Sequence, residues 1–199
     1  MNDLVEVKDI PGKGKGVVAL KPLKAGACIL AELPLFYIPT GNEDTKPARI
    51  LSAFDKLPVA TQTKYLDLHE WEPKTPGTCL KSPRWKSRPA HERKIISIFF
   101  CNNWDGRMMY MGSRFNHECV PSAESSFDGD GRYQAVLLRD VEMGEEVTVT
   151  YIWDESPVSA EERREKLRLW GFECGCSACV EGAVVAGDDV VDLDVEAQS

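Results

Sequence analysis

The sequence predicts a mainly β fold that also carries α-helices, on three observations. Short β-type runs bounded by turn residues fill both ends of the 199-residue chain. Apolar residues at helical spacing interrupt these runs in the middle. Three cysteines within six positions follow the last β-type run and indicate a metal-bound segment. We therefore expect several small β-sheets, a helical insertion and a zinc-bound segment near the end of the chain.

The first 39 residues alternate short strands with turns. Glycines at positions 12, 14 and 16 punctuate the start, because glycine adopts tight-turn backbone conformations at little cost. Two apolar runs, Cys28–Leu30 and Leu35–Ile38, then predict short strands.

The middle of the chain has helical character. A compact apolar run over 95–101 predicts a helix that ends at Asn102-Asn103, and repeated prolines between Trp71 and Pro89 predict a loop. Two earlier helices are predicted by apolar residues at helical spacing, namely Ile50, Leu51, Phe54 and Leu57, and then Tyr65, Leu66 and Leu68.

Strands return in the last third of the chain. Two β-rich runs, 133–138 and 147–151, are bounded by turn sequences. Ser159 and Glu162 form a capping-box pattern that predicts a charged helix over 160–169. Residues 181–199 contain six acidic residues, no basic residue and no aromatic residue, so we expect a flexible acidic tail.

Charge is spread unevenly along the chain, whose formal net charge is −8. Residues 1–100 hold 16 basic and 11 acidic side chains, or +5, and residues 101–199 hold 8 and 21, or −13. A uniformly basic nucleic-acid-binding protein is disfavoured, because phosphate binding needs a cationic surface. No apolar run approaches the ~20 residues that span a bilayer. We therefore expect neither nucleic acid nor membrane as a direct partner.

Seven cysteines divide into one group and three single residues. Cys174, Cys176 and Cys179 are close enough to converge on one tetrahedral Zn²⁺, which needs a fourth soft ligand. Cys119 is the best candidate, because it lies beside His117 in a turn-forming stretch. Four thiolates leave no open coordination position, so one structural zinc per chain is predicted. Small buried thiols are the alternative, and this alternative is favoured for Cys28, Cys79 and Cys101.

The first residues lack the basic and then apolar pattern of a signal peptide. Seven cysteines without an export signal favour reduced thiols or metal ligands over disulfides. We expect the protein in the nucleus, the cytoplasm or both.

The glycine-rich run Gly12–Ala19 allows more than one interpretation. A phosphate-binding P-loop is excluded, because no Gly-Lys-Ser/Thr follows at the required spacing. The run mimics the G-x-G-x-x-A fingerprint of dinucleotide binding, but Pro22 and Gly26 break the helix that must follow. A plain β-turn is the simplest interpretation.

Two further segments combine chemically capable residues. In Asn116–Pro121, His117 next to Cys119 would suit a Cys/His nucleophile pair, although a metal-ligand role for Cys119 argues against a thiol hydrolase. Gly144–Tyr151 is a turn and a strand that ends in an aromatic residue, for which core packing is the default.

Taken in order, these segments resemble the SET-domain family of protein lysine methyltransferases. Gly12–Ala19 is similar to the family's opening cofactor loop, and Asn116–Pro121 to its Asn-His-x-Cys-x-Pro motif. Gly144–Tyr151 is similar to its Gly-Glu-Glu-Leu-Thr-x-x-Tyr motif, and Cys174–Cys179 to its post-SET Cys-x-Cys-x-x-Cys motif. Each motif alone is weak, whereas the ordered set over about residues 5–180 is highly specific.

The segment Trp170–Cys174 and the helical insertion resemble the SET–MYND-like branch of the family. No MYND zinc finger is expected in the insertion, because its only cysteines are Cys79 and Cys101. The resemblance implies a SET domain over 1–157 with a helical insertion at about 45–110. It also implies a post-SET helix and zinc-binding cysteines over 158–180, followed by the tail at 181–199.

The activity implied by the resemblance is transfer of a methyl group from S-adenosylmethionine to a lysine ε-amine of a histone or another protein. Tyr151 matches the catalytic tyrosine, whose hydroxyl orients the amine and acts electrostatically on the transferring methyl group. The partner would be a protein or peptide with a target lysine, and the enzyme a monomer. The implied zinc ligands are Cys119, Cys174, Cys176 and Cys179, and the implied cofactor contacts are Lys15, Gly16, Val17, Asn102, Asn116, His117, Tyr151 and Phe172.

Two positions depart from the family pattern. Ser122 stands where many members have asparagine, and its shorter side chain reaches less far to support the loop. Val149 stands where histone-specific members often have phenylalanine or tyrosine, so we expect room for more than one methyl group on the amine. Two other function classes stay open: a catalytically silent SET-like binding or scaffold module, and a SET-derived protein that acts on a small molecule.

Overall fold

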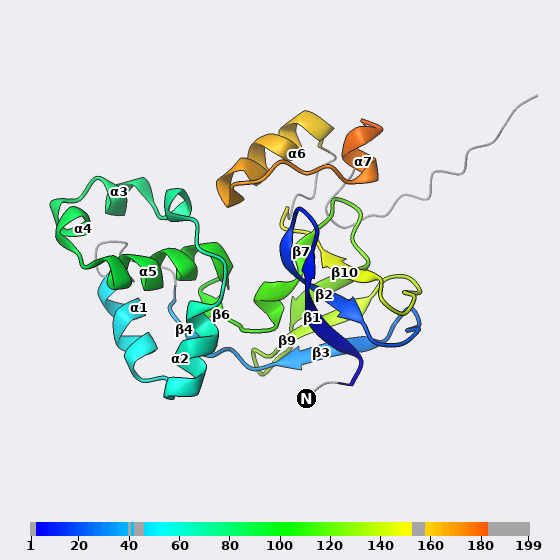
Figure 1. Ribbon diagram of the computed structural model, residues 1–199, viewed down its shortest axis with the longest axis horizontal. Coiled ribbons are helices and arrows are strands. Elements are labelled where there is room, and N and C mark those ends of the chain that lie inside the picture. The colour runs from blue at the N-terminus through cyan, green and yellow to red at the C-terminus, as the bar shows by residue number, and fades with distance from the viewer. Residues whose placement is uncertain (1–2, 40, 42–45, 153–157, 183–199) are drawn as a thin grey trace, which may run out of the picture.

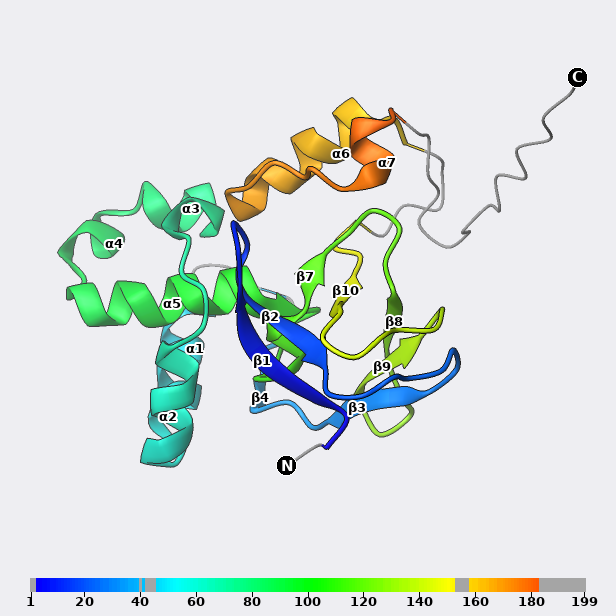
Figure 2. The ribbon, with the colours of Figure 1, turned by 45° about the vertical axis from the view of Figure 1, so that its right-hand side comes forward.

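The computed structural model describes residues 3–39, 41, 46–152 and 158–182. Three small β-sheets lie beside a lobe of helices, and a separate pair of helices lies over one end of the sheets (Figures 1 and 2). The several small sheets and the helices that the sequence predicts are confirmed. Most of the predicted acidic tail, residues 183–199, lies outside the described residues.

The first sheet brings together segments that are far apart in the sequence. Its order is β1 (Val5–Ile10), β2 (Gly14–Ala19), β10 (Glu146–Val149) and β7 (Asn116–His117). β1 and β2 form an antiparallel hairpin, whose turn is made possible by positive φ at Gly12 and Gly14. β10 and β7 pair in parallel, with Val149 opposite His117. The end of β10 therefore lies next to the Asn116-His117 dipeptide.

The other two sheets have three strands each. One has the order β3 (Cys28–Glu32), β9 (Tyr133–Leu137), β8 (Ala123–Phe127). The other has the order β4 (Phe36–Tyr37), β6 (Arg107–Met108), β5 (Asn103–Trp104). Alternate residues of β9 are buried, as expected for a strand with one face on the core. The main core forms between the first two sheets and includes Val17, Ile29, Tyr133, Ala135, Val147 and Val149.

The helical lobe has a core of its own. Ile50, Phe54, Tyr65 and Phe99 are buried together, and the Tyr65 hydroxyl donates to the carbonyl of Ile95 at 2.7 Å. A buried tyrosine needs such a partner for its hydroxyl. The lobe is built from α1 (Lys46–Asp55), α2 (Val59–Leu66), η1 (Glu72–Lys74), α3 (Gly77–Leu80), α4 (Pro83–Ser87) and α5 (Ala90–Asn102).

The loop predicted between Trp71 and Pro89 is wrong, because this stretch contains three short helical turns. A proline in the first turn of a helix is tolerated, since its missing N–H has no partner there anyway. The Ser82 hydroxyl accepts a hydrogen bond from the backbone N–H of Arg84 and caps α4. Trp85 is buried and donates to Glu72 at 2.9 Å, which anchors the turns to the lobe.

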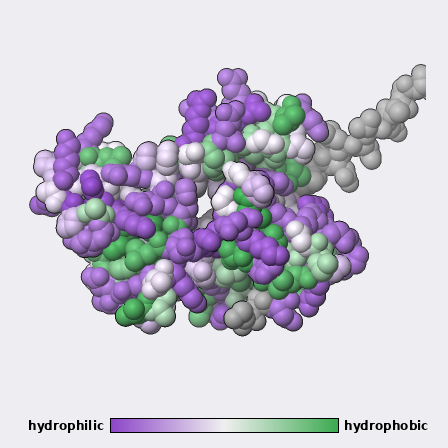
Figure 3. Space-filling model, viewed as in Figure 1, coloured by the Kyte–Doolittle hydropathy of each residue, from purple (hydrophilic) through white to green (hydrophobic). Residues whose placement is uncertain are grey.

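The capping box predicted at Ser159 is confirmed. The Ser159 hydroxyl accepts from the Glu162 N–H, and the Glu162 carboxylate accepts from the Ser159 N–H. The helix ends slightly earlier than predicted and tightens into a 3₁₀ turn. Hydrophilic side chains of this region project at the top of the surface in Figure 3. The elements here are α6 (Ala160–Leu167), η3 (Arg168–Trp170) and α7 (Ser177–Val180).

Candidate active site

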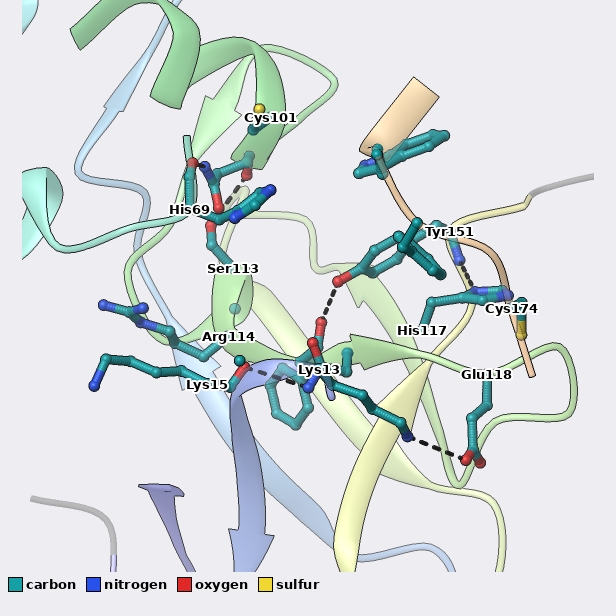
Figure 4. Close-up of a pocket in the computed structure, with 18 of the residues that line it drawn as sticks. Lys13, Lys15, His69, Cys101, Ser113, Arg114, His117, Glu118, Tyr151 and Cys174 are labelled. Carbon is teal, nitrogen blue, oxygen red and sulfur yellow. Dashed lines mark hydrogen bonds and ion pairs between the residues drawn. The ribbon is translucent and has the colours of Figure 1, made fainter. Parts of the chain in front are cut away.

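A cavity of about 960 Å³ lies where the sheets, the helical lobe and the segment after α6 meet. Five parts of the chain line it: the β1–β2 turn, residues 67 and 69 after α2, the segment over 101–105 at the end of the helical lobe, the segment over 112–118 and the segment over 170–176. Tyr151 at the end of β10 completes the wall (Figure 4). Six of the predicted cofactor-binding residues line this cavity, namely Lys15, Asn102, Asn116, His117, Tyr151 and Phe172.

Tyr151 is held at both its backbone and its hydroxyl. The hydroxyl donates to the carbonyl of Phe115 at 2.5 Å, and the backbone N–H donates to Nδ1 of His117 at 3.0 Å. Burial, followed by the charge of Glu146, raises the pKa of Tyr151 well above its ordinary value. The hydroxyl therefore stays protonated at neutral pH and can donate or accept a hydrogen bond at a fixed place.

Aromatic rings surround Tyr151 within the cavity. Trp104 meets the ring of Tyr151 edge-on, with centroids 6.0 Å apart. Trp170 and Phe172 lie at 5.6 and 6.4 Å from the same ring. Rings in this arrangement form an apolar wall around the Tyr151 ring.

The Asn116 side chain is oriented by two acceptors. Its amide nitrogen donates to Glu146 at 2.7 Å and to the carbonyl of Lys15 at 3.3 Å. Both N–H groups are thereby used, so the amide oxygen is the atom left for a ligand. The other Glu146 oxygen accepts from Lys13 at 2.7 Å. Burial lowers the pKa of Lys13, but Glu146 and Glu118 raise it by more, and Lys13 stays charged.

Gly16 and Val17 do not line the cavity, in contrast to Lys15 beside them. Val17 is fully buried in the main core. A Cβ atom on Gly16 would lie 2.6 Å from Glu146 Oε1 and 2.8 Å from Asn116 Nδ2. Glycine is thus required here because Asn116 and Glu146 pack directly against the strand. The implied contacts of Gly16 and Val17 with a cofactor stay a prediction.

Asn102 and His117 are both buried at the edge of the cavity. The Asn102 amide nitrogen donates to the carbonyls of His69 and Ile98, at 2.8 and 2.7 Å, which ties the lobe together. The ring of His117 lies 6.1 Å from the ring of Phe172. Burial lowers the pKa of His117 to about 4, against an opposite effect of Cys176, so its imidazole is neutral at physiological pH.

The four predicted zinc ligands form one cluster. The Sγ atoms of Cys119, Cys174, Cys176 and Cys179 all lie within 4.8 Å of one another. Cys119 Sγ is 3.9 Å from that of Cys174 and 3.4 Å from that of Cys179. Tetrahedral Zn–S bonds of about 2.3 Å require sulfur atoms about 3.8 Å apart, so this donor set fits zinc.

A positively charged side chain supports the cysteine cluster. Arg163 is 1% exposed, and its guanidinium lies 3.7 Å from Cys179 Sγ and 3.1 Å from the carbonyl of Ala178. A buried cation at this distance favours thiolates over thiols, which metal binding requires. Cys28, Cys79 and Cys101 lie apart from the cluster and form no disulfide.

Several side chains that build the site were not predicted from the sequence. Glu32 accepts three backbone hydrogen bonds, from residues 110, 111 and 112, and so fixes the segment that leads to Asn116. Arg114 is buried and pairs with Asp67 of the lobe at 2.6 Å. Trp104 directly follows the predicted helix end. In the sequence, Glu32 could have been noticed as a carboxylate that ends a β-type run, and Arg114 as an arginine within an apolar segment.

The two departures from the family pattern have clear places in the structure. Ser122 is fully buried and exchanges two hydrogen bonds with Thr148, one at 2.9 Å from the Thr148 N–H and one at 3.3 Å to its hydroxyl. Serine therefore supports the loop after all. Val149 is also fully buried in the main core and does not line the cavity. The structure thus gives Val149 no direct contact with the space in front of Tyr151.

One known protein family matches the part of the chain that carries most of these residues. The model of the SET domain family matches residues 14–152, which is more than half of the chain. The chain belongs to the SET-domain family. The matched range contains the Asn116–Pro121 and Gly144–Tyr151 motifs in the order in which the family has them, and it ends next to Tyr151. In the part of the chain that the structure describes, none of the helices has the length and apolar character needed to cross a bilayer.

Two curated proteins illustrate the similarity. The histone-lysine N-methyltransferase set5 of Schizosaccharomyces pombe is 30% identical over 178 residues, which are 89% of this chain and 50% of that protein. The histone-lysine N-methyltransferase SMYD3 of Homo sapiens is 34% identical over 89 residues, which are 42% of this chain and 20% of that protein. The chain therefore spans half the length of the first relative and a fifth of the second.

The fold is shared with solved structures, of which one serves as an example. A crystal structure of the SET domain of LSMT bound to lysine and AdoHcy matches with a TM-score of 0.51 at 15% identity. The match covers 86% of this chain and 53% of that chain. At this level of identity the likeness concerns the fold alone.

Proposed function

We propose that this protein is an S-adenosylmethionine-dependent protein lysine N-methyltransferase. The observation that carries the proposal is one cavity that holds the Tyr151 hydroxyl together with Asn116, His117 and Phe172. These are the residues that the motifs single out, and the chain is a SET-domain protein.

The donor set suits the cofactor. The Asn116 amide oxygen, left over by its two N–H bonds, would accept from the ammonium group of the amino-acid part. Phe172 beside His117 provides an aromatic surface for the adenine. Lys15 would contribute charge at the polar end of the cavity. When bound, the cofactor supplies a methyl group on a positively charged sulfur, which needs no metal for activation.

The chain's own atoms would orient the incoming amine. The Tyr151 hydroxyl oxygen and the second lone pair of the Phe115 carbonyl both accept hydrogen bonds at one place. An amine held there points in a single direction, and positioning of this kind accounts for a large share of the rate in group transfer. The Trp104 and Trp170 rings would exclude water along the aliphatic stem of the lysine.

A histone or another basic protein is our proposed substrate. The relatives set5 and SMYD3 are both named histone-lysine N-methyltransferases. The −13 charge of residues 101–199, from 8 basic and 21 acidic side chains, would attract a lysine-rich segment through its field. Tight binding is then expected to weaken as ionic strength rises.

We further propose one zinc ion on the four cysteines, as a structural centre that stabilises the segment after α6. Metal analysis of the purified protein should find about one equivalent per chain. Cys176→Ser should unfold the C-terminal segment, visible as a loss of protection over 160–180 in hydrogen exchange. Metal-free protein with this segment intact would contradict the proposal.

A labelled-methyl transfer assay tests the proposed activity. Histones, whole-cell lysate and small amines are each incubated with labelled S-adenosylmethionine, and cofactor affinity is measured separately by calorimetry. Transfer to protein lysines, located by mass spectrometry, supports a protein lysine methyltransferase. Transfer to small amines alone would favour a small-molecule enzyme, and absence of cofactor binding at high micromolar concentration would favour a scaffold module.

A further inference from the structure

The side chain of His117 connects the cysteine cluster with Tyr151 through hydrogen bonds. His117 is 5% exposed, and its Nδ1 accepts the backbone N–H of Tyr151 at 3.0 Å. On the other side of the ring, Nε2 lies 3.4 Å from Cys119 Sγ. Figure 4 shows the His117 ring between Tyr151 and Cys174, another member of the cluster.

The hydrogen bond to Nδ1 decides where the ring proton lies. A nitrogen that accepts an N–H carries no proton, so the proton of the neutral imidazole lies on Nε2. Nε2–H then donates to the sulfur of Cys119. A continuous chain of donors and acceptors runs from Cys119 Sγ through His117 to the backbone of Tyr151, and from its hydroxyl to Phe115.

Tyr151 depends on this ring because the strand ends before it. The parallel pairing of β10 with β7 stops at Val149 and His117, and the Val149 carbonyl accepts from the Glu118 N–H at 3.1 Å. The N–H of Tyr151 instead finds its partner in a side chain. The placement of the hydroxyl thus depends on a ring whose second anchor is a cysteine of the cluster.

We propose that His117 is a positioning residue that couples the state of the four-cysteine centre to the placement of Tyr151. Metal on the thiolates fixes Cys119, Cys119 fixes the ring through Nε2–H, and the ring fixes the Tyr151 backbone. Loss of the metal frees Cys119 and loosens Tyr151 without any contact between metal and substrate. This inference rests on the proposed function for its catalytic consequence, although the coupling itself is independent of methyl transfer.

Two substitutions test the two ring nitrogens of His117 separately. In His117→Asn the side-chain amide reaches the place of Nδ1 and keeps an acceptor for Tyr151, but nothing reaches Cys119. In His117→Gln the amide nitrogen reaches the place of Nε2 and keeps a donor for Cys119, but the acceptor for Tyr151 is lost. His91→Gln is the matched control, because His91 is exposed on α5 and lies outside the cavity lining.

The experiment uses the full chain labelled with ¹⁵N-tyrosine, which gives one amide signal for each of the five tyrosines. Hydrogen exchange of the Tyr151 amide reports on its bond to His117. Release of zinc to a chromogenic chelator and the charge-transfer bands of the cobalt-substituted protein report on the centre. Turnover and cofactor affinity are measured in parallel.

The coupling predicts opposite patterns for the two variants. His117→Asn should release zinc ~10- to 100-fold faster but keep the Tyr151 amide protected at saturating zinc. His117→Gln should retain zinc at nearly the normal rate, expose the Tyr151 amide and lower turnover ~10- to 100-fold. Chelation of the unsubstituted protein should expose the same amide, and this arm depends on no variant folding.

Two results would overturn the coupling: an unchanged Tyr151 amide after complete zinc removal, or equal damage to both readouts in both variants. Exchange that follows zinc in a protein without methyl-transfer activity would uphold the coupling and refute only the proposed function. Normal transfer by chelated protein with a protected amide would refute only the coupling.

Discussion

At the scale of single residues, the Tyr151 hydroxyl is the group whose removal should affect chemistry most. Tyr151→Phe deletes the donor to Phe115 and an acceptor for the amine, but leaves the ring among its aromatic neighbours. We expect kcat to fall ~10²- to 10³-fold, while the cofactor dissociation constant changes much less. Steady-state kinetics and calorimetry separate the two effects. A parallel loss of affinity and turnover would assign the hydroxyl to cofactor binding instead.

Ser122 gives a second test at this scale. Ser122→Ala leaves the buried N–H of Thr148 without its acceptor, so we expect unfolding to become easier by about 1–3 kcal/mol in urea titrations. Ser126→Ala is the control, because Ser126 is exposed on β8 and should change stability by less than about 0.5 kcal/mol. Equal effects at both positions would show that the hydrogen bonds with Thr148 contribute nothing.

Residue identities could be predicted where a motif carries them, and not where their role depends on a distant partner. The four cysteines and the position of Tyr151 at a strand end follow from local spacing. The sequence does not reveal that Glu146 orients Asn116, because 30 positions separate the two residues and only the sheet brings them together. The same holds for Gly16, whose missing side chain makes room for both.

At the scale of elements, the turn after η3 determines how the segment over 170–176 lies along the cavity. Gly171 has a φ of 80°, and a Cβ atom there would lie 2.7 Å from the Trp71 ring of the lobe. Next to it, the Lys74 ammonium lies 3.2 Å from the centroid of the Trp170 ring. The lobe and the segment after α6 therefore meet through tight contacts at the edge of the site.

Gly171→Ala should disturb this meeting point. Left-handed backbone costs alanine about 1–2 kcal/mol, and the contact with Trp71 adds steric strain. Gly26→Ala is the matched control, because Gly26 has a φ of 81° and open space around it. We expect a larger loss of stability in Gly171→Ala, together with weaker cofactor binding by calorimetry. Indistinguishable variants would show that the Trp71 contact is dispensable.

Elements were predictable where periodicity is long and failed where it is short. α1 buries one apolar face with Ile50 and Phe54, α5 buries the continuous apolar run that was predicted as a helix, and the capping box marks the start of α6. The helical turns between Trp71 and Pro89 are too short to show a periodic face. Their stability comes from tertiary contacts such as the Trp85–Glu72 bond, which no local pattern contains. β8 was missed for a related reason, because its polar residues alternate around only two buried positions.

At the scale of the whole molecule, buried tyrosines predict how the protein responds to alkali. Burial is the main cause that raises the pKa of Tyr65, Tyr133 and Tyr151 above the ordinary value of 10.0. The folded state therefore holds these protons more tightly than the unfolded chain. Their contribution to stability is complete below pH 10 and declines as pH rises above it.

Above pH 10, each such tyrosine lowers the free energy of unfolding by about 1.4 kcal/mol per pH unit. The three together lower it by about 4 kcal/mol per pH unit. Urea titrations at increasing pH should show this slope. The tyrosinate absorbance of these three residues should appear together with the loss of circular dichroism, in one transition. Gradual ionisation of all tyrosines near pH 10 in a folded protein would contradict the assigned burial.

The fold class could be predicted from the sequence, but the pairing of strands that assembles the site could not. Alternating short strands, a helical middle and clustered cysteines gave the mainly β fold with its insertion. The parallel pairing of β10 with β7 could not be foreseen, because a two-residue strand has no pattern of its own. That pairing brings His117 to Tyr151 and thereby assembles the site.

With the proposed metal bound, the cysteine cluster would also act as a cross-link along the chain. Cys119 and Cys174 are 55 positions apart, so a metal that joins them closes a loop of that length. In the chain-entropy account of covalent cross-links, such a loop removes about 4 kcal/mol of freedom from the unfolded state. During synthesis, Cys119 leaves the ribosome long before its three partners, which can capture a metal by themselves. With the proposed metal bound, completion of the centre would therefore tie the segment after α6 to Cys119 beside the first sheet.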